Sequence, residues 1–150
     1  MPARRSVRIL LFGAALALLL AVGLGLYALR DSRARVIDES TDATGWKTLE
    51  YEGVRVNIPS DWERLDMGGC DFRFERWAPQ GVSPCDPDAE GVAFYGSATF
   101  DPDLGPGVIR NDGEDPKIPG WEGYVYAGEF AVHASSNDRA VVEGILDSAK

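Results

Sequence analysis

Two cysteines are the residues whose type and spacing most directly suggest chemistry. Cys70 and Cys85 are the only cysteines, and the fourteen residues between them include Pro79, Gly81 and Pro84. A turn-rich segment of this kind can bring two thiols together, and in an oxidising compartment such a pair becomes a disulfide. The sequence therefore predicts a Cys70–Cys85 disulfide in an exported domain, with two free thiols, or a metal or redox site, as the alternatives.

A single histidine limits the catalytic mechanisms that the chain could use. His133 would have to serve as the base for any serine or cysteine nucleophile. Around it, Phe130 and Val132 share one face of a predicted strand, which leaves His133 on the other face with Ala131. No Gly-x-Ser-x-Gly motif occurs. We predict no catalytic residue and no enzymatic activity; an envelope hydrolase is the alternative.

Acidic residues cluster in three segments, 86–90, 101–103 and 111–115. Carboxylate oxygens in such loops are typical calcium ligands, but none of the segments has the spacing of an EF-hand loop. Pro87 and Pro102 suit turns equally well. We expect a solvated acidic surface with no metal ligand and no cofactor, and a calcium-dependent adhesive module is the alternative.

The 150 residues leave room for one folded domain. Charge is unevenly distributed along them. All 24 Asp and Glu and 12 of the 15 Lys and Arg lie from position 30 onward, so the balance there is 12 − 24 = −12. A surface this acidic repels phosphate backbones and anionic lipid headgroups. The sequence therefore argues against nucleic acid as a partner.

Positions 9–29 form an uninterrupted apolar segment without charge. As a helix they would span roughly 31 Å, which matches a bilayer hydrocarbon core of about 30 Å. We predict a transmembrane helix at 9–29 that contacts membrane lipid and serves as a signal anchor. It separates a cytoplasmic tail at 1–8 from a tether at 30–45 and an extracytoplasmic domain at 46–150. A cleaved signal peptide and a buried helix of a soluble domain are the alternatives.

The orientation of this segment depends on two features. Three arginines on each side leave the positive-inside rule nearly tied, with the α-amino group favouring a cytoplasmic N-terminus. The cysteine pair favours the same orientation, with the domain outside. A recurrence of small residues every four positions suggests a helix face for homodimer formation, with chance as the alternative; these residues are Gly13, Ala17, Ala21 and Gly25.

Alternation of apolar and polar residues predicts strands after position 46. We expect a hairpin at 46–51 and 54–58, strands at 72–77 and 92–100, and a second hairpin at 121–126 and 129–135. The Pro-, Gly- and Asp-rich segments 78–91 and 101–120 are expected to be irregular surface loops.

At the C-terminal end the apolar period becomes helical. Val141, Val142, Ile145, Leu146 and Ala149 form one stripe of a helix predicted over 138–149, which Ser135 or Ser136 could cap. This stripe must be buried on the sheet. The predicted fold is therefore α+β: one antiparallel-sheet domain with the C-terminal helix packed on one face.

Three segments carry a resemblance to a known group of domains. They are Tyr51-Glu-Gly-Val-Arg-Val-Asn-Ile-Pro-Ser-Asp-Trp62, the strand Gly123-Tyr-Val-Tyr, and the closing Ile145-Leu-Asp-Ser148. Together they resemble exported bacterial domains of the Mog1/PsbP-like group. The resemblance implies a binding or accessory domain. The segment 70–120 departs from the group's pattern because it contains no clear helix.

Two tyrosines raise the question of a ligand surface. Tyr124 and Tyr126 share one face of a predicted strand, and that face either receives the helix or forms an aromatic platform; core packing is favoured. The expected function is that of a membrane-anchored domain of the bacterial cell envelope that binds an envelope protein or a small ligand.

Overall fold

The computed structural model describes residues 34–38, 45–97, 105–112 and 115–150. All of them belong to one compact unit, Arg33–Lys150. The predicted cytoplasmic tail at 1–8, the transmembrane helix at 9–29 and its small-residue stripe lie outside the described residues. Within the described ranges, no helix is long and apolar enough to cross a membrane.

Three strands form a small antiparallel sheet in the order β1-β2-β3, with β1 at Arg35–Asp38, β2 at Trp46–Tyr51 and β3 at Val54–Pro59. The hairpin predicted from the sequence is confirmed as β2 and β3. Glu52 and Gly53 form its turn with φ values of 46° and 89°, the positive values that a tight two-residue hairpin turn requires.

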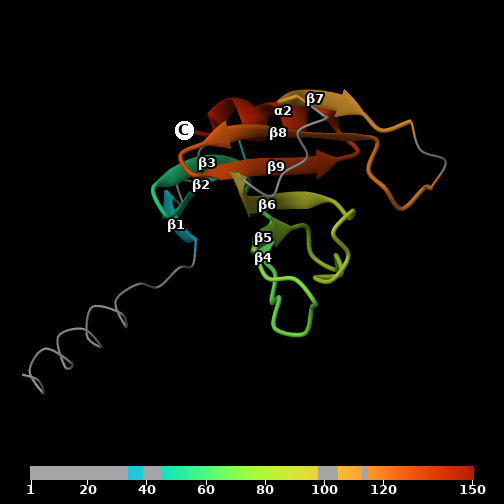
Figure 1. The fold of residues 1–150 in the computed structure, drawn as a ribbon, viewed down its shortest axis with the longest axis horizontal. Helices are drawn as coiled ribbons and strands as arrows, with labels where there is room; N and C mark the ends of the chain where they lie inside the picture. The colour runs from blue at the N-terminus through green and yellow to red at the C-terminus, as the bar shows by residue number, and fades with distance from the viewer. Residues whose placement is uncertain (1–33, 39–44, 98–104, 113–114) are drawn as a thin grey trace, which may run out of the picture. The chain divides into compact units, whose positions relative to one another are not determined.

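A second sheet has six strands, all antiparallel, in the order β4-β5-β6-β9-β8-β7 (Figure 1). Its strands are β4 (Glu63–Arg64), β5 (Glu75–Ala78), β6 (Gly91–Gly96), β7 (Gly107–Arg110), β8 (Trp121–Ala127) and β9 (Phe130–Ser136). The predicted second hairpin is confirmed as β8 and β9, which pair along their whole lengths.

The expectation of one sheet is wrong, because the described residues form two. The apolar side of the β2–β3 hairpin packs face to face on the larger sheet and makes no edge pairing with it. The ring centroid of Tyr51 in β2 lies 5.0 Å from that of Phe94 and 5.1 Å from that of Phe130. The hairpin buries its apolar residues in the core that it shares with the larger sheet, which is the physical reason for two layers.

Helix α2 spans Arg139–Ser148 and confirms the predicted C-terminal helix. Its cap is Asp138, whose carboxylate accepts a hydrogen bond from the Ala140 N–H at 2.9 Å. The predicted caps are wrong, because Ser135 and Ser136 are the last two residues of β9 and are already buried there. The buried face of the helix contains Val142, Ile145 and Leu146.

Helix and small sheet cover the same face of the six-stranded sheet, so the domain is a two-layer α+β structure. One continuous apolar core joins the three parts, and its fully buried members include Leu49 and Val56 from the small sheet, Val92 and Val132 from the larger sheet, and Ile145 from the helix. The opposite face of the larger sheet therefore points away from this core.

Several strand boundaries differ from those expected. In the segment 72–77 the strand begins only at Glu75, and β6 ends at Gly96 within the described residues. Strand β4 was not predicted; Arg64 in β4 makes two hydrogen bonds, at 2.8 and 2.9 Å, to the carboxylate of Glu75 in β5, which fixes this short pairing.

Strands β1 and β7 were also missed. Strand β7 lies inside the expected loop 101–120 and pairs with β8, and β1 lies inside the expected tether 30–45 and pairs with β2. Each has four residues, too few for alternation to be visible, and each depends on pairing with a longer strand.

Candidate functional site

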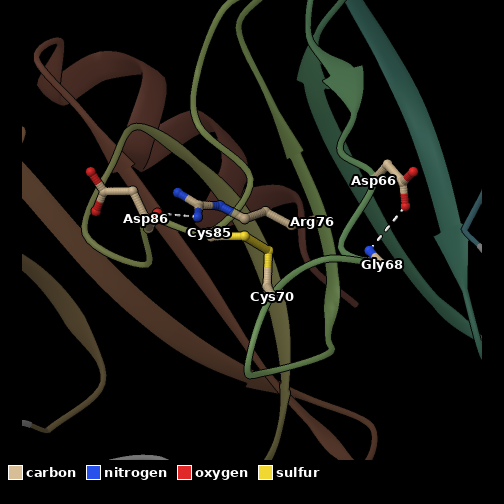
Figure 2. Close-up of a disulfide and its surroundings, with 6 residues drawn as sticks. All are labelled: Asp66, Gly68, Cys70, Arg76, Cys85 and Asp86. Carbon is tan, nitrogen blue, oxygen red and sulfur yellow. Dashed lines mark hydrogen bonds between the residues drawn. A yellow bond between two sulfur atoms is a disulfide. The ribbon is translucent and has the colours of Figure 1, made fainter.

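The predicted disulfide is present. The sulfur atoms of Cys70 and Cys85 are 2.05 Å apart and the two Cα atoms 5.1 Å apart, and the bond closes the segment between β4 and the loop that follows β5 (Figure 2). No free cysteine remains. Both thiols are therefore consumed, which excludes a cysteine nucleophile paired with His133 as well as a two-thiol metal site.

Arg76 binds the loop that follows Cys85. Arg76 is 2 % exposed, and its side chain extends from β5 to the loop at 86–89. The guanidinium donates a hydrogen bond to the backbone carbonyl of Asp86 (Figure 2). It donates another, at 2.6 Å, to the carbonyl of Ala89. The Ser135 hydroxyl in β9 donates to the same Ala89 carbonyl at 3.0 Å. The loop is thus attached to the sheet by two side chains in addition to the disulfide.

The buried guanidinium is electrostatically supported. Burial lowers the pKa of Arg76, while Tyr95, Asp86 and Asp88 act in the opposite direction. For Tyr95, burial raises the pKa of the hydroxyl and Arg76 opposes the rise. A buried charge is tolerated only when it is paired and hydrogen-bonded, and here backbone carbonyls and nearby acids supply both conditions.

A row of rings lies on the sheet face that points away from the helix, and we call it the aromatic face. It is formed by Phe72, Phe74, Tyr95, His133, Tyr124 and Tyr126. Strand alternation explains its position: Tyr95, His133 and Tyr124 alternate with the core residues of β6, β9 and β8.

The rings of the aromatic face are in contact along most of the row. Centroid distances are 5.0 Å between Phe72 and Phe74, which are stacked, 4.5 Å between Phe74 and Tyr95, and 6.1 Å between Tyr95 and His133. Tyr124 is the cross-strand partner of His133. The row therefore connects the disulfide-closed segment, which contains Phe72 and Phe74, with the β8–β9 hairpin.

The two tyrosines of β8 have different environments. They share one face as predicted, and their ring centroids are 5.4 Å apart with an angle of 79° between the ring planes. Tyr124 is 4 % exposed and Tyr126 is 51 % exposed. Core packing, the favoured interpretation, is confirmed for Tyr124, which is buried, and is wrong for Tyr126, which is available at the surface. The helix packs on the other face of β8, so the face that carries the two tyrosines does not receive it.

His133 is paired with an acid. Its Nε2 lies 3.5 Å from Oε2 of Glu122, and its side chain is 16 % exposed. The hydrogen bond from His133 lowers the pKa of Glu122, burial opposes this shift, and the charge of His133 adds to it. The pair joins β9 to β8 at diagonal positions of one face. The pair therefore links the two strands at one edge of the aromatic face.

Two described carboxylates of the acidic segments accept hydrogen bonds within their own turns. The carboxylate of Asp86 accepts from the Asp88 N–H at 3.2 Å, and that of Asp115 accepts from the Lys117 N–H at 3.0 Å. In the described part of the chain, no three His, Cys, Asp or Glu side chains are close enough together to hold a metal ion. Positions 101–103 and 113–114 lie outside the described residues.

Comparison with known proteins adds no identity. No family model, no curated protein and no solved structure matches the chain. The resemblance to the Mog1/PsbP-like group therefore stays a prediction.

Sequence reasoning found the disulfide and the shared face of the two tyrosines, but it missed Arg76 and Glu122. The only signal for Arg76 was a charged residue between Glu75 and Trp77 in a strand, and nothing in the sequence indicated that its partners would be backbone carbonyls ten and thirteen residues later.

Proposed function

We propose that the chain is a single-pass membrane protein of the bacterial cell envelope whose domain lies outside the cytoplasmic membrane and binds another protein or a small ligand. The N-terminus is inside, the apolar segment 9–29 is the anchor, and the domain has a binding or accessory role and no catalytic one. The length of that segment and the disulfide support this proposal, because disulfides persist in oxidising compartments.

The aromatic face is the observation on which the binding role depends. Tyrosine is enriched at protein interfaces because it combines a large apolar ring with a polar hydroxyl. Tyr126, at one end of the row, is half exposed, and the segment at the other end is fixed by the disulfide and Arg76. The aromatic face thus combines strand residues with Phe72 and Phe74 of a loop segment, and loops positioned by a rigid sheet are typical locations for recognition.

Site-specific photo-cross-linking in the native envelope tests this role. A photoreactive residue at Tyr126 should give a defined cross-linked product, whereas the same residue at Asp147, an exposed position of helix α2, should give none. Equal products from both positions, or none from either, would contradict a binding role for the aromatic face.

Thiol labelling tests the orientation independently. In intact cells, Cys70 and Cys85 should react with a membrane-impermeant maleimide only after a reductant has been added, because they form a disulfide outside the membrane. Labelling that needs permeabilisation and no reductant would show that the domain is inside.

A further inference from the structure

Because β1 pairs with β2, the folded domain begins closer to the apolar segment than the predicted tether at 30–45 implies. Arg35 pairs with Glu50 and Val36 pairs with Leu49, in an antiparallel ladder with β2. Ala34 belongs to the apolar core at 8 % exposure, and Val36 packs against that core. The chain is therefore part of the folded domain from Ala34 onward, twelve positions before Trp46.

The number of residues between positions 29 and 34 limits how far the domain can lie from the end of the predicted anchor. An extended chain covers at most about 3.6 Å per residue. From position 29, the end of the predicted anchor, to position 34 it reaches at most about 18 Å, whereas a tether that continued to position 46 would reach about 60 Å. This upper limit holds for any conformation of the residues between them.

We propose that β1 is a strap that holds the domain at the bilayer surface, so that its partner is another protein in the same membrane. The inference rests on the proposed function, since it requires the segment 9–29 to be a membrane anchor. A short connection favours partners in the same membrane because it raises their effective concentration at the domain.

Charge argues against the lipid surface itself as the partner. From position 34 onward the chain has 10 Lys and Arg and 23 Asp and Glu, a balance of 10 − 23 = −13. Anionic headgroups repel such a surface. The strap therefore brings the domain close to a lipid surface that the domain does not bind. The acidic domain is complementary in charge to a neighbouring membrane protein whose extramembrane part carries basic residues.

Energy transfer in vesicles tests the strap on the full chain. The tryptophans of the domain are donors, and a dansyl-headgroup lipid in phosphatidylcholine vesicles is the acceptor. Flotation comes first: a protein that does not float with the vesicles would refute the membrane anchor and hence the proposed function, whereas the outcomes below concern only the strap.

Two variants lengthen the connection in different ways. Twelve Gly and Ser residues inserted between Arg33 and Ala34 leave β1 intact and add about 20 Å of root-mean-square reach, so transfer should fall at least about two-fold. Val36→Pro removes an N–H and a packed side chain from β1 and should cause a similar loss if the tryptophan spectrum stays native. Ile37→Ala, at a 46 % exposed position of the same strand, is the matched control and should retain wild-type transfer.

Equal transfer in the wild type and the insertion variant would overturn the strap. Transfer that rises when phosphatidylglycerol is added to the vesicles would show that lipid contact, and no strap, holds the domain at the surface.

Discussion

Arg55 and Lys150 exchange two backbone hydrogen bonds, from the Arg55 N–H to the Lys150 carbonyl at 2.9 Å and from the Lys150 N–H to the Arg55 carbonyl at 3.1 Å. Beside them, the hydroxyl of Ser148 accepts from the Asn57 N–H at 2.8 Å and donates to the Ile145 carbonyl at 2.7 Å. Ser148, the last residue of helix α2, and Lys150 beyond it thus pair with backbone groups of β3, which is an edge strand of the small sheet. They protect this edge from pairing with other chains.

Replacing Ser148 should therefore weaken the connection between helix and small sheet. Ser148→Ala removes two hydrogen bonds at a partly exposed position and should lower the free energy of unfolding by about 1 kcal/mol. Urea unfolding followed by tryptophan fluorescence measures this. The control is Asp147→Ala at the neighbouring exposed position, where loss of a negative charge at the helix C-terminus should be neutral or slightly stabilising. Equal losses in both variants would contradict the role of Ser148.

Loss of the disulfide should have a larger effect. The bond closes a separation of 15 residues, and replacement of both Cys70 and Cys85 by serine should cost about 3 kcal/mol of unfolding free energy in the chain-entropy model. Reductant should produce the same change in the wild-type chain and none in the double variant. Ser83→Ala, at an exposed position of the same loop, is the control for local effects. Stability that does not change on reduction would show that the loop is held by its other contacts alone.

Those other contacts depend on Arg76. Arg76→Lys keeps the charge but cannot reproduce the two-pronged donation to the Asp86 and Ala89 carbonyls, so it should cost about 2 kcal/mol. Amide hydrogen exchange should accelerate across positions 79–90. Arg73→Lys, at an exposed position of the same segment, should change neither quantity. An unchanged exchange rate in the Arg76 variant would show that the guanidinium does not fasten this loop.

Local sequence signals account for the parts of the fold that were predicted correctly. The β2–β3 and β8–β9 hairpins and helix α2 each contain enough residues for a period to be visible, and the cysteine pair needs only a flexible turn-rich segment between its members. Strands β1 and β7 form because they pair with the longer strands β2 and β8. This dependence on distant partners leaves no visible alternation of apolar and polar residues within four positions.

Contacts between residues distant in sequence also limit what could be predicted of the candidate site. Alternation placed Tyr124 and Tyr126 together, but which face of β8 the helix covers depends on how the two layers stack. The Glu122–His133 pair depends on the register of β8 against β9. The two-residue connection at Gly128 and Glu129 fixes the register of this hairpin, and that register places Glu122 and His133 on one face. The connection is therefore a sequence signal for this pair.

Gly123 allows β7 to approach β8. A Cβ atom at this position would lie 2.2 Å from the Gly107 carbonyl oxygen and 2.9 Å from the Cα of Val108, both backbone atoms that cannot move independently. Gly123→Ala should therefore cost about 3 kcal/mol or separate β7 from the sheet. Gly120→Ala, where a Cβ atom meets nothing within 4 Å, is the matched control and should be tolerated. Urea unfolding distinguishes them, and equal stability of the two variants would refute the close approach.

The Glu122–His133 pair should make stability depend on pH in the acid range. Its hydrogen bond lowers the pKa of Glu122 below the ordinary value of 4.5, so the folded state favours the carboxylate. The contribution is fully present above pH 4.5 and is lost as the pH falls through the lower folded-state pKa, because the unfolded chain binds the proton first.

With a third of the Glu122 side chain exposed, the contribution should amount to less than about 1 kcal/mol. Urea unfolding between about pH 7 and about pH 3 measures it as the difference between wild type and Glu122→Gln. That difference should favour the wild type at neutral pH and shrink below pH 4.5. A difference that stays constant down to the lowest pH would mean that the stabilisation by Glu122 comes from packing, since only a titrating carboxylate can lose it in this range.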